Sequence, residues 1–133
     1  MALFRGMRPD PTDQLPLVSN TASGLGVREG APPIGDIPVY DGWVKPQEGG
    51  MSVVADAPDS LPGHRVPPPK GTGKHHLIFS LEEEQLPAQL IARQDQPENN
   101  PAHRSIEPVE DCRIEEFRQQ IVSTRKDWKI FHE

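Results

Sequence analysis

Short apolar runs, each closed by proline, glycine or a polar turn, dominate the pattern along this chain. The first run, ALFRGM at residues 2–7, is followed by the turn signal PDP. Similar runs lie at residues 51–54, 75–80 and 90–92. Apolar, β-branched and aromatic residues beside turn formers favour β-strands. The pattern therefore predicts several short strands rather than long helices.

The C-terminal segment carries the clearest helical pattern. Its large apolar residues recur at intervals that place them on one helical face: Ile114, Phe117, Ile121 and Trp128. Asp111 precedes them and is a residue type that caps helix N-termini well. We therefore expect an amphipathic helix that begins near Asp111 and buries this face against a sheet.

Two further segments carry weaker helix signals. Ser80 is followed by Glu83 in the spacing of a capping box, which predicts a short helix that ends before Pro87. Residues 19–26 are rich in Ser, Thr, Asn and Gly, which favours either a turn or a short N-capped helix. The sequence leaves both readings of residues 19–26 open.

Composition limits the fold to one loop-rich unit. The chain has 133 residues, 34% of them hydrophobic, with 11 glycines and 16 prolines. This length suits one domain, which we expect to span residues 1–133. No alternating β–α–β rhythm is visible. The expected fold class is α+β, a compact domain with short, mostly antiparallel strands and a C-terminal amphipathic helix.

Charge and cysteine content restrict the partners and the compartment. The formal net charge is −6 and no block of basic residues occurs, so no nucleic-acid partner is indicated. No apolar run approaches the roughly 18 residues of a membrane span, and no signal-peptide pattern opens the chain. A single cysteine fits a reducing compartment. We expect a cytoplasmic protein, and delivery to a target cell without a cleaved signal stays open.

Three features that often mark chemistry are weak in this chain. Acidic neighbours of Cys112 would raise its pKa and make it a poor nucleophile. Adjacent His75 and His76 on a strand would point to opposite faces, so no metal site is expected. The GTGK segment at residues 71–74 lacks the remaining residues of a phosphate-binding loop, although its lysine and amides could contact an anion.

Arg5 and Ser52 form the most informative polar pair. Arg5 stands at the predicted end of the first strand, directly before Gly6, and Ser52 lies in the strand introduced by Gly49 and Gly50. An arginine at a strand end can bind a phosphate with its planar guanidinium. A serine on a neighbouring strand can position that arginine or bind a ribose hydroxyl. We expect the two side chains to meet in one cleft.

Ordered short blocks across most of the chain carry a family resemblance. They lie at residues 3–7, 25–28, 36–37, 49–53, 61–67, 71–74 and 106–108. In this order the blocks resemble a family of small bacterial proteins, which is similar to type VI secretion effectors with an ADP-ribosyltransferase-like fold. The resemblance runs from Leu3 to Trp128. It implies an ADP-ribosyltransferase-like fold and NAD as the substrate.

The resemblance also implies roles for particular residues. Arg5 matches the NAD-binding residue of the first strand, and Ser52 matches the residue that supports the nicotinamide site. The catalytic glutamate of the superfamily has no direct counterpart, because His103 or Arg104 stands at its place. Glu107 is the nearest carboxylate and the first candidate to replace it. His103 is the rival, as a neutral acceptor or general base.

Two functions from different classes follow from the sequence. The first is a toxin-like effector that binds NAD and transfers ADP-ribose, or a degenerate relative of such an enzyme. The alternative is a non-catalytic interaction protein bound by a cognate immunity or antitoxin partner. The position of the first-strand arginine favours the enzyme, whereas the missing glutamate favours the interaction protein, because a developing ribosyl cation needs a nearby negative charge.

Overall fold

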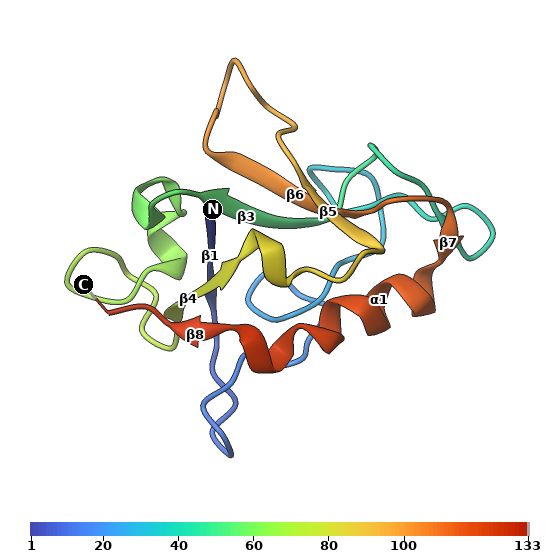
Figure 1. Ribbon diagram of the computed structural model, residues 1–133. Helices are drawn as coiled ribbons and strands as arrows, with labels where there is room; N and C mark the ends of the chain where they lie inside the picture. The colour runs from blue at the N-terminus through green and yellow to red at the C-terminus, as the bar shows by residue number, and fades with distance from the viewer. Residues whose placement is uncertain (133) are drawn as a thin grey trace.

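The centre of the protein is a six-stranded sheet in the order β5-β6-β3-β1-β4-β8, and every neighbouring pair in it is antiparallel. The computed structural model describes residues 1–132. Figure 1 shows the path of the chain. The strands of this sheet are β1 (Ala2–Met7), β3 (Met51–Ala55), β4 (Leu77–Glu82), β5 (Leu90–Arg93), β6 (His103–Pro108) and β8 (Lys129–Ile130).

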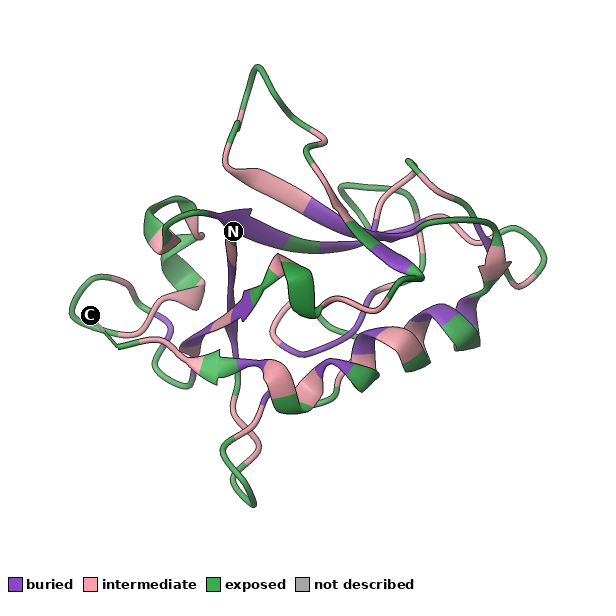
Figure 2. Cartoon of the chain, in the orientation of Figure 1, coloured by how far each residue is buried: buried purple, intermediate pink, exposed green. Residues whose placement is uncertain are grey.

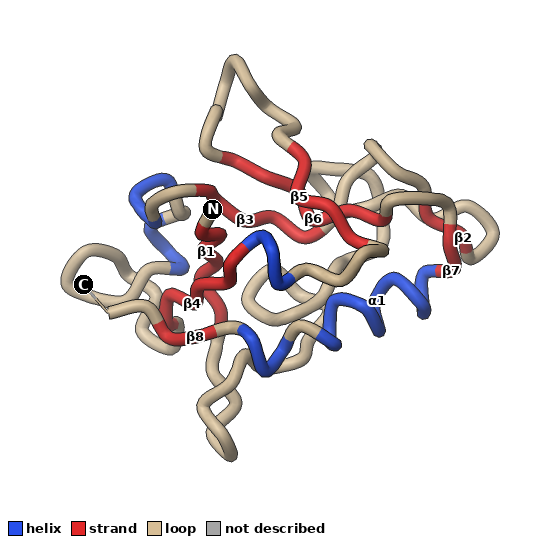
Figure 3. The backbone as a smooth tube through the Cα atoms, viewed as in Figure 1, coloured by secondary structure: helices blue, strands red, loops and turns tan. Residues whose placement is uncertain are grey.

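A second, two-stranded sheet and one α-helix complete the regular structure. Strands β2 (Trp43–Val44) and β7 (Cys112–Arg113) pair antiparallel, and α1 (Ile114–Ser123) follows β7 directly. Four short 3₁₀ turns join these elements: η1 (Pro58–Ser60), η2 (Gly63–Arg65), η3 (Glu83–Gln85) and η4 (Arg125–Asp127). Figure 3 shows how much of the chain is loop. The expected α+β class with antiparallel strands and abundant loops is confirmed.

The main hydrophobic core lies between the sheet and α1. Alternate residues of the strands, such as Leu3, Val53 and Leu81, point to this face and are buried. The helix contributes Phe117 and Ile121, which are fully enclosed. Figure 2 shows buried and exposed residues alternating along α1. The predicted amphipathic helix and its buried face are thus confirmed for these residues.

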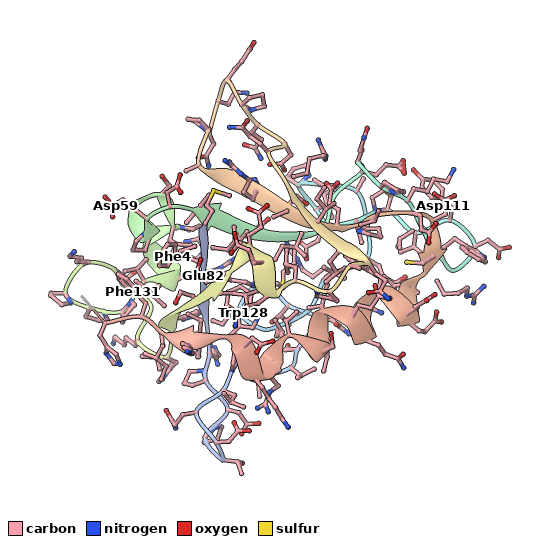
Figure 4. All side chains as sticks on the ribbon, in the orientation of Figure 1. Phe4, Asp59, Glu82, Asp111, Trp128 and Phe131 are labelled. Carbon is pink, nitrogen blue, oxygen red and sulfur yellow. The ribbon has the colours of Figure 1, made fainter. Side chains whose placement is uncertain are left out.

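A smaller apolar cluster covers part of the opposite sheet face. Phe4, Val54 and Ile78 are buried there, and Phe131 packs against them. The rings of Phe4 and Phe131 meet edge to face with centroids 5.1 Å apart (Figure 4). The sheet is therefore covered on both sides over its middle strands. Among the described residues, no helix is long and apolar enough to cross a bilayer.

The helix boundaries differ from those that the sequence predicts. Asp111 does not cap α1, because residues 112–113 form β7 and Arg113 occupies the N-cap position without a side-chain bond. Trp128 is buried, but it lies beyond the end of α1, after η4. Its indole Nε1 donates to Thr124 Oγ1 at 2.9 Å. The spacing therefore identified a buried face correctly but extended the helix one turn too far.

The structure also decides the two weaker helix signals. Ser80 lies inside β4, and the capping box is formed two residues later by Glu82 and Gln85 at η3. The strand continues through Ser80 because residues 77–82 pair with all of β1. Residues 19–26 form turns rather than a helix. Tertiary pairing overrides the local signal in the first case.

The helix offers a moderate test of the core. Phe117→Leu keeps an apolar side chain at a fully buried position but leaves unfilled volume. We expect the free energy of unfolding to fall by about 1 to 2 kcal/mol. Urea denaturation followed by circular dichroism measures this value. An unchanged midpoint would show that α1 contributes little to the core.

Candidate functional site

A cleft opens where β1 and β3 separate. These strands pair only at Leu3–Ala55 and Phe4–Val54, and beyond that point they diverge. Figure 1 shows the two strands running in different directions from their shared end. Beyond Phe4 the two strands have no backbone pairing, and the Arg5 side chain connects them instead. Its Nη1 donates to the Ser52 carbonyl at 2.7 Å. The structure therefore brings Arg5 and Ser52 together, as the sequence analysis expected.

Arg5 is not the exposed strand-end residue that the sequence suggests. Strand β1 continues to Met7, and Arg5 retains only 5% exposure. Its Nε and Nη2 both donate to the Gly24 carbonyl, at 3.2 and 3.0 Å. Burial lowers the pKa of Arg5 to about 10, so the guanidinium remains charged at neutral pH. Most of its donors hold the loop at residues 21–24 and the strand β3 in place.

We call the space beside this bridge the cleft hollow, and it has a volume of about 190 Å³. Three of the four predicted site residues line it, namely Arg5, Ser52 and His103. Arg65 and Asn100 also line it. Ser52 and His103 belong to adjacent strands and share one sheet face, because Ser52 pairs with Ser105 and Val54 pairs with His103.

Arg65 is the second arginine of the cleft hollow. Its Nη1 donates to the Ala22 carbonyl at 3.0 Å, so it holds the same loop as Arg5. Burial, followed by the charge of Arg28, lowers the pKa of Arg65. Arg65 also packs so closely on β1 that a Cβ at position 6 would collide with its carbonyl oxygen. This approach explains why glycine follows Arg5.

His103 is held by a carboxylate. Its Nδ1 lies 2.6 Å from Asp95 Oδ1, and both side chains are largely buried. The carboxylate accepts the Nδ1 proton, which leaves Nε2 as the acceptor of a neutral ring. We call a second space, of about 230 Å³, the Asp36 hollow. Ser52 and His103 line both spaces, so the two hollows adjoin.

The Asp36 hollow adds one arginine and two carboxylates. Arg28 Nη2 donates to Asp36 Oδ1 at 2.9 Å, and Asp36 Oδ2 also accepts the backbone N–H of Arg28. This hydrogen bond to Asp36 raises the pKa of Arg28. Asp95 is the other carboxylate in the lining. No carboxylate lines the cleft hollow itself within the part of the chain that the structure describes.

Glu107 lies outside both hollows. It shares the sheet face of His103, but four residues further along β6, about 14 Å away at the ordinary strand rise. Only 1% of its side chain is exposed. Its carboxylate accepts two bonds from Arg93, at 2.8 and 2.9 Å, and a third from the Gln47 N–H at 3.0 Å. The structure therefore separates Glu107 from the other three predicted residues.

Asp95, Arg65 and Asn100 are site residues that sequence reasoning missed. Asp95 could have been found from the hairpin of β5 and β6, because the pairing of Arg93 with Ser105 puts Asp95 opposite His103. Arg65 falls inside the block at residues 61–67 that carries the family resemblance. Nothing in the sequence pattern singles out Asn100.

The structure also places the weaker candidates. Burial, followed by Glu116, Asp111 and Glu110, raises the pKa of Cys112, as its neighbours predicted. Cys112 lies in β7 rather than in a helical turn. In residues 1–132, no group of three or more His, Cys, Asp or Glu side chains is arranged to hold a metal ion.

Comparison with known proteins adds no assignment. No protein-family model matches this chain, and no curated protein matches it. The two hollows and the residues that line them therefore carry the functional information in this structure.

Proposed function

We propose that this chain is a toxin-like effector with an ADP-ribosyltransferase-like fold that binds NAD in the cleft between β1 and β3. One observation carries the proposal: Arg5, Ser52 and His103 come from three strands and line one hollow. These strands, β1, β3 and β6, are neighbours in the sheet. Their order matches the first, middle and later strands that the family resemblance assigns to NAD binding and catalysis.

The shape and charge of the two adjoining hollows support a dinucleotide ligand. Together the two spaces fall within the roughly 300–1,000 Å³ of ordinary ligand pockets, at its lower end. Ser52 and His103 stand where the two spaces meet, so one half of the ligand would lie on each side. Arg65 is more exposed than Arg5 and carries a guanidinium donor group with fewer internal bonds. Arg65 is therefore the better partner for the pyrophosphate, while Arg5 shapes the cleft.

We assign the role of general base to His103, supported by Asp95, because Glu107 lies too far from the cleft hollow. In the transfer step, a target hydroxyl or amine forms a bond to the anomeric carbon of the nicotinamide ribose. The bond from that carbon to the nicotinamide nitrogen breaks, and nicotinamide leaves with the electron pair. His103 Nε2 takes the proton of the attacking group. The Asp95 carboxylate, 2.6 Å from the ring, stabilises the resulting imidazolium.

The proposal predicts that His103→Ala removes function without unfolding the protein. Wild-type protein expressed in bacteria is expected to inhibit growth and to release nicotinamide from NAD. The variant is expected to lose at least about a hundredfold in nicotinamide release, as for other general bases. Arg65→Ala is expected to weaken NAD binding, measured by calorimetry. Circular dichroism checks the fold of each variant.

His64→Ala is the matched control, since His64 is exposed and lines neither hollow. It is expected to behave like wild type. A wild-type protein that neither binds NAD nor inhibits growth would contradict the proposal. So would a His64 variant that loses as much activity as the His103 variant.

A second candidate is a non-catalytic protein recognised by an immunity or antitoxin partner. One surface feature favours it: Tyr40 and Trp43 are about half exposed and exchange two backbone hydrogen bonds across a tight turn. Arg113 lies over the Trp43 ring, at 5.7 Å from its centroid. Exposed Trp, Tyr and Arg are the residue types that dominate protein interfaces. A wild type that is inert towards NAD would favour this second function.

A further inference from the structure

A basic hollow lies on a different part of the surface, where the chain leaves β1 and later enters β4. Four side chains with basic groups line it, namely Arg8, Lys74, His75 and His76. The loop that follows β1, drawn in blue at the bottom of Figure 1, forms one wall. We call this space the Arg8–Lys74 hollow. It shares no lining residue with the cleft hollow or the Asp36 hollow.

The two strongest cations of this hollow are not neutralised. Arg8 and Lys74 are exposed, and within residues 1–132 neither side chain has an ion pair or a side-chain hydrogen bond. The acidic residues of the neighbouring loop are engaged elsewhere. Arg125 binds Asp13 at 2.8 Å and Asp10 at 3.3 Å. The hollow is thus positive in a chain whose net charge is −6.

A buried ring nitrogen adds a second, independent observation. His76 is only 9% exposed, and its Nε2 lies 2.9 Å from Ser23 Oγ. Its Nδ1 is buried and has no hydrogen-bond partner. A buried polar atom without a partner is rare and costly, and this nitrogen keeps its capacity to hydrogen-bond a further group. Burial lowers the pKa of His76, and the charges of Arg8, Arg65, His64 and His75 lower it further.

We infer that the Arg8–Lys74 hollow binds a phosphate group. The Arg8 guanidinium can hold two phosphate oxygens at once, and the Lys74 ammonium adds a point charge. When Ser23 donates to Nε2, the His76 Nδ1–H becomes a donor for a third oxygen. Lys74 of the GTGK segment thus contacts a phosphate, although the segment is not a phosphate-binding loop. This site is independent of the proposed NAD site.

The test is a phosphate titration of the full chain at pH 7, followed by two-dimensional NMR and compared with sodium chloride at equal ionic strength. We expect saturable shifts confined to residues 8–17 and 74–77. The double variant Arg8→Ala/Lys74→Ala is expected to bind at least about tenfold more weakly, because two charge-assisted contacts are lost. Both residues are exposed, so the variant should fold.

The double variant Lys126→Ala/Lys129→Ala is the matched control, since it removes two exposed positive charges at another place. It is expected to bind phosphate like wild type, and so is His103→Ala. A parallel titration with AMP, followed only through the shifts of residues 8–17 and 74–77, distinguishes the source of the phosphate. Tighter binding of AMP there identifies a nucleotide, and equal binding identifies free phosphate. Shifts that do not saturate, or an equal loss in the Lys126/Lys129 control, would overturn the inference.

Discussion

Arg5→Ala is expected to destabilise the protein by about 2–4 kcal/mol, because backbone carbonyls that the guanidinium binds lose their donor, at about 1–3 kcal/mol for each buried group. The change leaves the carbonyls of Gly24 and Ser52 without donors in a buried setting. It also removes the only side chain that the structure shows bridging the divergent ends of β1 and β3 in residues 1–132. Urea denaturation at pH 7 measures the loss.

Arg113→Ala controls for the loss of an arginine, since about half of the Arg113 side chain is exposed. We expect it to change the free energy of unfolding by less than about 0.5 kcal/mol. Arg5→Lys is expected to fall between wild type and Arg5→Ala, because an ammonium cannot hold Gly24 and Ser52 with one planar group. If Arg5→Ala is as stable as the wild type, the guanidinium does not support the fold and is available to bind a ligand.

This expectation changes how an inactive Arg5 variant is interpreted. From the sequence, Arg5 looked like an exposed phosphate ligand whose removal leaves the fold intact. In the structure it connects strand β3 to the loop at residues 21–24, and Arg65 holds the same loop through Ala22. A loss of toxicity in Arg5→Ala would therefore be explained by the loss of folded protein before any loss of ligand binding. Arg65 and His103 are the cleaner probes of the cleft.

Local pattern was sufficient to predict the four strands β1, β3, β4 and β5. In β1, Leu3 and Met7 belong to the main core and Phe4 to the cluster on the opposite face. In β3, Val53 and Val54 are divided in the same way. Apolar residues on both faces are what a strand in a sheet covered on both sides requires. The capping signal at Ser80 failed for a physical reason. A helix there would forfeit the pairing of Ser80 with Phe4 and of Leu81 with Leu3, which the sequence alone does not reveal.

The site was predictable only in part, because its geometry depends on strand order. Arg5 and Ser52 are 47 positions apart, and His103 lies much further along the chain, yet β1, β3 and β6 are neighbours in the sheet. Periodicity predicts separate strands but cannot say which of them pair, so it does not give that order. The Asp95 contact depends on the register of β5 with β6, and the burial of Glu107 depends on the loop that carries Gln47. The first could be reached from the hairpin once its register is known, whereas the second has no local signal.

Glu107→Ala is expected to destabilise the protein by about 3–5 kcal/mol, because it leaves the partly buried Arg93 guanidinium without its carboxylate. An arginine keeps its proton at any ordinary pH, so the Arg93 guanidinium stays charged in the variant. The Gln47 N–H loses its acceptor as well. Thermal and urea unfolding of the purified variant measure the change.

A double-mutant cycle separates this structural role from a catalytic one. Arg93→Ala leaves Glu107 charged and buried without its partner, so it should destabilise at least as much as Glu107→Ala. The double variant Glu107→Ala/Arg93→Ala is expected to be more stable than the sum of the single losses predicts, since neither charge is then left alone. A structural ion pair requires this coupling. If Glu107→Ala instead unfolds like wild type but no longer releases nicotinamide from NAD, then Glu107 rather than His103 is the catalytic group, and the cleft must rearrange to bring it to the ligand.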